Sequence, residues 1–258
     1  MFLMSLPKSI QIARLQQQIN RMTVNGQAAA YSLSDHDAPA EGHSRTHLPE
    51  RLAPGCIHEV EGASWDAETG IGPAAFAAAM LSRIEQGAIL WAVRQDAPFA
   101  PRLAAFGLDP DRVIFCRCAN DSETLAALED GLRTKGIAAA VGEVAQVTLT
   151  QSRRLHLICE ASKATGLLLR RHFHGATRAR KPQASAATSR WRIGFAPTEP
   201  AAPGLGTPRW RLDLLYCRGG MPASFLVEWN DETHHLRLVA KLADHETVPD
   251  DAGLRRTG

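Results

Sequence analysis

A glycine-bearing loop follows the first strand predicted in the core, and its residue types decide what chemistry it can do. Residues 62–72 read Gly-Ala-Ser-Trp-Asp-Ala-Glu-Thr-Gly-Ile-Gly, and no lysine occurs between Lys8 and Lys135. A phosphate-cradling loop needs a lysine on the phosphates and a hydroxyl on magnesium, whereas carboxylates repel phosphate. We therefore expect a degenerate phosphate loop that opposes nucleotide binding. Its residues are Gly62, Asp66, Glu68, Thr69, Gly70 and Gly72.

A second constellation of residues is basic. Residues 151–218 hold 13 Lys and Arg against 3 Asp and Glu, and the rest of the chain holds 16 against 24, although the net charge is only +2. Arginine and lysine neutralise phosphates, and His or Phe can stack on bases, so segment 170–189 favours single-stranded DNA or an acidic partner. A solvated arginine-rich loop is the alternative. The candidate binding residues are Arg170, Arg171, His172, Phe173, Arg178, Arg180 and Lys181.

Other possible chemistries find no support in the sequence. Cys116 and Cys118 are spaced as on one face of a strand, but no second cysteine pair completes a zinc site. We find no Gly-x-Ser-x-Gly elbow, paired-carboxylate motif or His-Glu-x-x-His, which argues against a hydrolase, and no dinucleotide fingerprint for a dehydrogenase. The five scattered cysteines indicate reduced thiols, and no apolar run reaches the ~20 residues of a membrane span. We expect a cytoplasmic protein without metal or cofactor.

Three tryptophans fall in the last predicted strands. Trp191, Trp210 and Trp229 each lie in an apolar stretch, and arginines stand close to them in sequence. Core packing is the favoured interpretation. The alternative is an exposed surface of aromatic and arginine side chains for a protein partner.

The elements that must position these residues alternate between strand and helix. Apolar strands separated by helices require crossover connections, so we expect an α/β fold with a mostly parallel sheet, helices on both faces and a finish in antiparallel strands. The predicted strands are 56–60, 88–93, 112–116, 137–144, 167–169, 191–196, 209–217, 224–229 and 235–239. The predicted helices are 74–86 after Pro73, 99–106, 120–135 with Asn120 and Glu123 as capping box, and one capped by Thr150 that ends before Gly166.

The chain divides into four predicted parts. An apolar stripe of Ile12, Leu15, Ile19 and Met22 predicts an amphipathic helix within 1–24. An aperiodic linker follows at 25–51, then a core at 52–243 with its basic loop at 170–189, and a polar, flexible tail at 244–258.

Several segments, in order, resemble a known family. They are 54–60 (Pro-Gly-Cys-Ile-His-Glu-Val), 89–93, 106–113, 138–144, 152–155 and 208–215. With this arrangement the chain resembles the inducible-mutagenesis A proteins (ImuA), RecA-like accessory factors of bacterial SOS mutagenesis. The resemblance covers about residues 52–240 and implies a RecA-like fold.

The resemblance also implies where a nucleotide site would lie. RecA recombinases carry a lysine-bearing phosphate loop after the first core strand, and the matching loop here departs from that pattern. Their Walker-B strand ends in an aspartate that supports magnesium, and Glu143 is the Walker-B-like carboxylate of this chain. The basic segment matches the position of their loop for single-stranded DNA. We expect an inactive RecA-like ATPase fold, not an enzyme.

The resemblance implies partners as well. They are ImuB, a relative of Y-family polymerases, an error-prone C-family DNA polymerase, and as further candidates the RecA filament and single-stranded DNA. We expect a non-catalytic adaptor that helps assemble a mutagenic polymerase complex for translesion synthesis after DNA damage. An SOS cell-division inhibitor and a nucleotide-dependent recombination regulator remain the alternative functions.

Overall fold

The computed structural model describes residues 52–64, 71–94, 100–171, 184–198 and 207–242. The predicted amphipathic helix, the linker and the tail lie outside the described residues. So do most of the degenerate phosphate loop and the part of the basic segment from 172 to 183.

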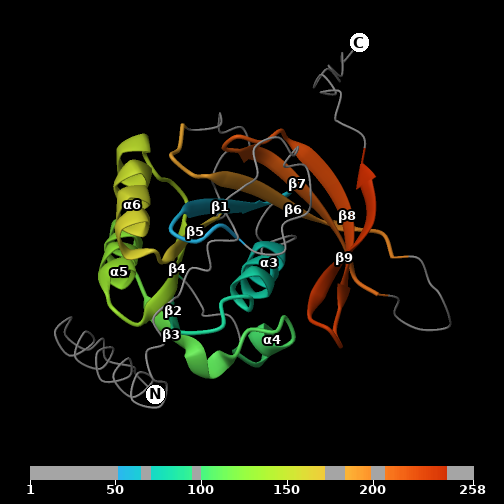
Figure 1. Ribbon diagram of the computed structural model, residues 1–258, viewed down its shortest axis with the longest axis horizontal. Coiled ribbons are helices and arrows are strands. Elements are labelled where there is room, and N and C mark those ends of the chain that lie inside the picture. The colour runs from blue at the N-terminus through green and yellow to red at the C-terminus, as the bar shows by residue number, and fades with distance from the viewer. Residues whose placement is uncertain (1–51, 65–70, 95–99, 172–183, 199–206, 243–258) are drawn as a thin grey trace, which may run out of the picture.

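Nine strands form one sheet in the order β3-β2-β4-β5-β1-β6-β7-β8-β9 (Figure 1). The strands are β1 Ile57–Gly62, β2 Ala88–Val93, β3 Val113–Arg117, β4 Ile137–Val144, β5 Thr165–Arg170, β6 Ser189–Ala196, β7 Arg209–Cys217, β8 Ala223–Asn230 and β9 His235–Leu242. β1 lies near the centre and pairs in parallel with both β5 and β6. The α/β class predicted from the sequence is confirmed.

The sheet changes character after β6. Every pairing from β3 across to β6 is parallel, and β6 to β9 pair antiparallel. β2 is buried at all six positions, as expected of a parallel strand covered on both faces. β7 instead alternates between buried and half-buried residues over most of its length, as expected of a strand with one covered face.

Helices cover both faces of the parallel part. They are α3 Ile71–Leu81, α4 Ala100–Ala104, α5 Asp121–Arg133 and α6 Leu149–Ser162, with a short 3-10 turn η1 at Pro110–Arg112. α5 and α6 lie side by side on one face, and α3 and α4 on the other (Figure 1). We call these the α5–α6 face and the α3 face. α3 is buried at nine of its eleven positions, because alanine, phenylalanine, methionine and leucine surround the helix axis.

Both boundaries of α3 differ from those predicted. α3 begins at Ile71 rather than after Pro73, and it ends at Leu81 rather than near residue 86. Residues beyond Leu81 form turns, since Arg83 is drawn to the β8–β9 connection, where its guanidinium donates to the carbonyl of His234. A tertiary contact thus ends the helix before the polar residues that the prediction included.

The cap of α6 is Thr148, not Thr150. The Thr148 hydroxyl accepts from the backbone N–H of Gln151, and the Gln151 side chain accepts from the backbone N–H of Thr148. This reciprocal capping box satisfies two donors at once. The threonine-to-glutamine spacing of three was the signal that the prediction missed. For α5 the predicted cap is confirmed, because the Asn120 side chain accepts from the N–H of Glu123.

The late tryptophans belong to the core. Trp191, Trp210 and Trp229 expose only 2–3% of their surface on the α3 face, and the rings of Trp210 and Trp229 stack with centroids 6.1 Å apart. Phe106 packs against both of those rings. The core interpretation is confirmed for all three, so the late strands close the α3 face rather than presenting these rings to a partner.

Candidate functional site

The candidate site lies where the carboxyl ends of β1, β4 and β5 meet. These strands are parallel neighbours, so their last residues share one edge of the sheet, the edge at which α/β folds bind ligands. Gly62 ends β1, Glu143 stands one residue before the end of β4, and Arg170 ends β5. The parallel pairing thus brings the degenerate phosphate loop, the Walker-B-like carboxylate and the start of the basic segment to one edge.

Glu143 is buried and balanced by an arginine of the same edge. Side chains alternate along β4, which puts Glu143 on the α3 face with Ala139 and Val141. The Glu143 side chain is 4% exposed, and Arg171 Nε lies 3.9 Å from Glu143 Oε2. The backbone N–H of Arg171 donates to the carbonyl of Val144 at 2.9 Å, which fixes that arginine at the end of the pairing. The fold itself therefore supplies a counter-charge to this carboxylate.

Arg170 lies in β5, not in a loop as the sequence predicted. Its guanidinium donates to the carbonyl of Ala145 at 3.2 Å. Burial lowers the pKa of Arg170 below its usual value, and the nearby carboxylates of Glu59 and Glu61 oppose that shift. Arg170 and Arg171 are thus half-buried and bound within the fold, because the pairing of β5 with β4 continues one residue further than its apolar stretch indicates.

The remaining charges at this edge are paired across strands. Arg190 Nε lies 3.2 Å from Glu59 Oε2, and Arg192 Nη2 lies 2.7 Å from Glu61 Oε1. Each arginine of β6 stands directly opposite its glutamate in β1 in the strand register. Opposite charges at facing positions stabilise the pairing of the two strands.

Asp121 holds the residues that follow β4 in place, and the sequence did not reveal this role. Its carboxylate accepts from Arg94 Nη1 at 2.8 Å and from the backbone N–H groups of Ala145 and Gln146 at 3.1 and 2.9 Å. As the first residue of α5 it also lies near the positive end of the helix dipole. The position of this acid directly after the N-cap residue Asn120 was the sequence signal that could have indicated its role. Asp121 positions the chain that follows Glu143.

The degenerate loop is described only at its two ends. The N–H of Ala63 donates to the carbonyl of Ile193 at 2.8 Å, which extends the pairing of β1 with β6. At the start of α3, a Cβ on Gly72 would lie 3.3 Å from Ile193 Cγ2, so apolar side chains crowd this helix end. Asp66, Glu68, Thr69 and Gly70 lie outside the described residues.

The basic segment is described at its two ends as well. His172, Phe173, Arg178, Arg180 and Lys181 lie outside the described residues, so five of the seven candidate binding residues are not placed. After the gap, the N–H of Ala186 donates to Ser152 Oγ of α6 at 3.0 Å, and the N–H of Thr188 donates to the carbonyl of Ile57 at 2.8 Å. The segment therefore returns to the sheet between α6 and β1.

No metal centre is found within the described part of the chain, where no group of three or more His, Cys, Asp or Glu could hold an ion. The thiol of Cys118 donates to the backbone carbonyl of Cys116 at 3.8 Å, and a side-chain hydrogen bond from Cys118 lowers the pKa of Cys116 to about 7. His234 and His235 contact Arg83, whose Nη1 lies 3.1 Å from His235 Nε2.

The fold and the sequence have relatives among known proteins. No family model matches the sequence. The structure of the RadB recombinase is similar with a TM-score of 0.52 at 15% identity, and the match covers 73% of this chain and 93% of that one. This fold defines a RecA-like protein. The chain is also 41% identical over 209 residues to Protein ImuA from two strains of Caulobacter vibrioides, covering 77% of this chain and 86% of each relative. It belongs to the ImuA family.

A RecA-like fold implies a nucleotide with magnesium at this edge, and the residues present do not fit that group. Residues 62–72 contain no lysine to contact phosphates. The carboxylate that would support magnesium, Glu143, is buried against the Arg171 guanidinium. A second cation at this position would have to compete with that fixed arginine.

Among the helices within the described ranges, none is both long and apolar enough to cross a membrane.

Proposed function

We propose that this protein is a non-catalytic RecA-like adaptor in error-prone translesion DNA synthesis after DNA damage, and that it helps assemble a mutagenic polymerase complex. Membership of the ImuA family and the RecA-like fold support a role in SOS mutagenesis. The observation that carries the non-catalytic part is the pairing of Glu143 with Arg171 at the edge where a nucleotide would bind.

The physical argument rests on charge. Phosphoryl transfer depends on cations that are positioned on the phosphates and on a carboxylate that is free to support magnesium. In this protein the guanidinium of Arg171 lies beside the carboxylate of Glu143, and the loop at 62–72 carries acidic residues and no lysine. A carboxylate that is paired within the fold and a loop without lysine give the edge little attraction for a magnesium nucleotide, yet the fold remains as a scaffold for protein contacts.

The proposed partners follow from the family. They are an ImuB-like relative of Y-family polymerases and an error-prone C-family DNA polymerase, with the RecA filament as a further candidate. We assign contact with single-stranded DNA or an acidic partner to the basic segment, through His172, Phe173, Arg178, Arg180 and Lys181. Arg170 and Arg171 have internal partners and serve mainly to anchor that segment to β5.

Nucleotide binding is tested by thermal unfolding with and without ATP and magnesium. A ligand at about 100 times its dissociation constant adds about 2.7 kcal/mol of stability. We expect no shift in the unfolding temperature and no release of phosphate. A shift that requires both ATP and magnesium would overturn the non-catalytic assignment and favour a nucleotide-dependent recombination regulator.

The adaptor role is tested by isolating the tagged protein from damage-induced cells and identifying the proteins that accompany it. We expect polymerase components with the wild type and a large loss of them, or of damage-induced mutation, when Arg178, Arg180 and Lys181 are all changed to Ala. A matched control changes three exposed cations elsewhere, Arg102, Lys135 and Lys241. Recovery of cell-division proteins instead would overturn the adaptor assignment in favour of a division inhibitor.

A further inference from the structure

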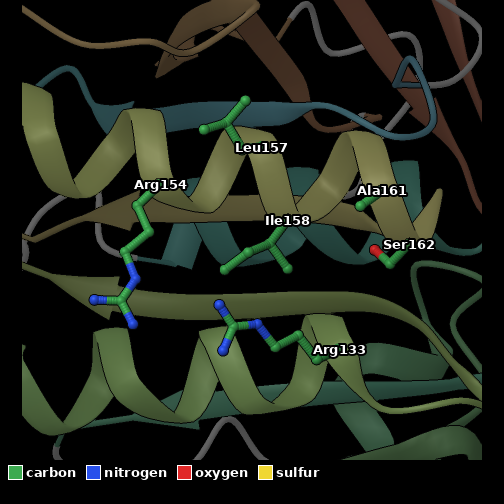
Figure 2. Close-up of a pocket in the computed structure, with 6 residues that line it drawn as sticks. All are labelled: Arg133, Arg154, Leu157, Ile158, Ala161 and Ser162. Carbon is green, nitrogen blue, oxygen red and sulfur yellow. The ribbon is translucent and has the colours of Figure 1, made fainter.

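A groove runs between α5 and α6 on the outer surface of the α5–α6 face. It has a volume of about 510 Å³. Ile158 points between the two helices and forms its floor, with only 8% of its surface exposed (Figure 2). Small side chains at one end, Ala161 and Ser162, leave room for a ligand to approach the helix closely. This groove lies away from the sheet edge that holds Glu143.

Two arginines reach into the groove from opposite helices. Figure 2 shows the guanidinium groups of Arg154 on α6 and Arg133 on α5 converging on one end of the groove, with Ile158 beside them. Arg154 Nε lies 2.5 Å from Glu129 Oε1, and the Arg154 side chain remains 62% exposed. None of the residues that line the groove is acidic. The groove thus carries two cations with one acid at its rim.

An exposed leucine adds an apolar contact beside these cations. Leu157 is 64% exposed, whereas the neighbouring α6 residues Leu155 and Cys159 are buried under the helix. The fold therefore does not need Leu157 for its core. An exposed leucine next to a concave, partly apolar surface is typical of a site that a partner covers.

We propose that the groove between α5 and α6 binds an acidic amphipathic helix of a protein partner. Carboxylates of that helix pair with Arg133 and Arg154, and its apolar side chains pack on Leu157 and Ile158, which is helix-in-groove recognition. This surface is separate from the adaptor role proposed above and does not depend on it.

Charge decides between this occupant and the others. The chain's own segment 8–23 is amphipathic, but it carries Lys8, Arg14 and Arg21 and no acid, so it would repel both groove arginines. A nucleic-acid backbone could pair with the two arginines, but it offers no apolar side chain to the exposed Leu157. An acidic helix satisfies the arginines and the leucine together.

The test selects binders from a library of random 16-residue peptides displayed on phage, with the full-length protein as bait. We expect enriched peptides that combine Asp or Glu with Leu, Ile or Phe at helical spacing. The synthetic form of the most enriched peptide, labelled with fluorescein, then serves as the probe for anisotropy measurements on the variants. An absence of enrichment, or enrichment of basic peptides, would overturn the proposal.

The variants locate the binding. Leu157→Asp and Arg133→Glu should each weaken binding of the fluorescein peptide by about tenfold or more. Arg153→Glu, at an exposed position of the same helix, is the matched control and should leave binding unchanged. Since all three positions are exposed, circular dichroism should report an unchanged fold. Equal binding by wild type and Leu157→Asp would mean that the peptide binds elsewhere, which contradicts the proposal.

One substitution should strengthen binding. Glu129→Gln removes the acid that competes for Arg154, so the acidic peptide should bind about threefold more tightly. A purely structural role of these residues would not give that gain. If Arg133→Glu instead abolished binding of a fluorescent oligothymidylate and left peptide binding intact, the groove would be a nucleic-acid site and the proposal would fail.

Discussion

The two faces of the sheet both pair their buried polar groups, but they differ at the surface. On the α3 face, polar side chains are buried and find their partners inside the fold: Glu143 faces Arg171, and His58 bonds to Ser189. On the α5–α6 face, Glu59 is likewise buried against Arg190, but two arginines and a leucine also lie at the surface around a groove. Within the described residues, Arg154 is the one of these two arginines that has a close acid, Glu129. The groove is therefore the part of the α5–α6 face that is open to a partner.

This difference indicates where a RecA-like fold can offer a binding surface away from the edge at which a nucleotide would lie. A nucleotide would lie at the sheet edge that holds Glu143, and the charges of that edge are paired within the chain on both faces, by Arg171 on the α3 face and by Arg190 and Arg192 on the α5–α6 face. A matched charge offers little free energy to a ligand, because the ligand must first displace the internal partner. The α5–α6 face has kept unmatched charge and apolar surface, which are the features that bind partners.

The largest expected effect concerns the buried pair. Arg171→Ala leaves the Glu143 carboxylate, 4% exposed, without that counter-charge. Breaking a buried pair by removing one partner costs about 3 to 5 kcal/mol, so we expect a loss of that order in the free energy of unfolding. Urea denaturation at neutral pH measures it.

A second variant separates charge from packing. Arg171→Ala combined with Glu143→Gln removes the buried charge along with its partner, and we expect it to recover more than about 1 kcal/mol of the loss. If Arg171→Ala alone costs less than about 1 kcal/mol, the carboxylate is already solvated or otherwise satisfied. The Glu143 charge would then not depend on Arg171, and the pairing of charges on the α3 face would be weaker than we infer.

His58 gives the next effect, a pH dependence on the same face. Burial lowers the pKa of His58 from 6.5 to about 4, with the Ala53 carbonyl opposing and His156 adding to the shift. Between pH 6.5 and 4 the unfolded chain therefore binds a proton that the folded protein rejects. Stability falls as the pH is lowered through this window, by about 1.4 kcal/mol per pH unit and about 3 kcal/mol in all.

The measurement is urea unfolding of wild type and His58→Gln at pH 7, 6, 5 and 4. Glutamine keeps a donor and an acceptor for Ser189 Oγ and the Ala53 carbonyl, which His58 contacts at 2.7 and 3.0 Å, but it does not titrate. The free energy of unfolding of the wild type should fall relative to that of His58→Gln as the pH is lowered from 6.5 to 4. Parallel pH profiles would show that His58 ionises without cost and that its pocket is open to water.

The fold was largely predictable from the sequence because its signals are local. Continuous apolar stretches such as 88–93 and 137–144 indicated parallel strands, and the turn at Gly136 indicated where α5 gives way to β4. The boundaries that were wrong depended on contacts distant in sequence. The end of α3 is set by Arg83 reaching the His234 carbonyl 151 positions away, which no local pattern contains.

The candidate site was predictable in part. The missing lysine and the carboxylate Glu143 were visible in the sequence, whereas the role of Arg171 was not, because it follows from the pairing of β5 with β4. The sequence placed Arg171 in the basic loop, because the residues around it in the chain are also basic. The groove could not be predicted either, because Arg133 and Arg154 meet only when α5 packs beside α6.

Gly142→Ala tests how tightly α5 packs on β4. A Cβ at Gly142 would lie 2.1 Å from Leu128 Cδ1 and 3.0 Å from Thr124 Cγ2, so either the Leu128 side chain or α5 itself would have to shift. Overpacking of this kind costs about 1 to 3 kcal/mol. Combining it with Leu128→Ala should cost less than the sum of the two single changes, as measured by urea unfolding. Strict additivity would show that α5 yields freely and that the groove has no fixed shape.

The smallest expected effect concerns Arg154, whose exposed ion pair can be compared with the buried pair of Arg171. Arg154→Ala removes an ion pair with Glu129, but the Arg154 side chain is 62% exposed and water replaces the lost contact. We expect a loss of less than about 1 kcal/mol in the free energy of unfolding, and less still in high salt, because exposed pairs are screened. Urea denaturation at low and high salt measures both. A loss above about 2 kcal/mol would mean that this pair holds α5 to α6 as Arg171 holds Glu143. The groove arginines would then be engaged in the fold, and the contrast between the two faces would disappear.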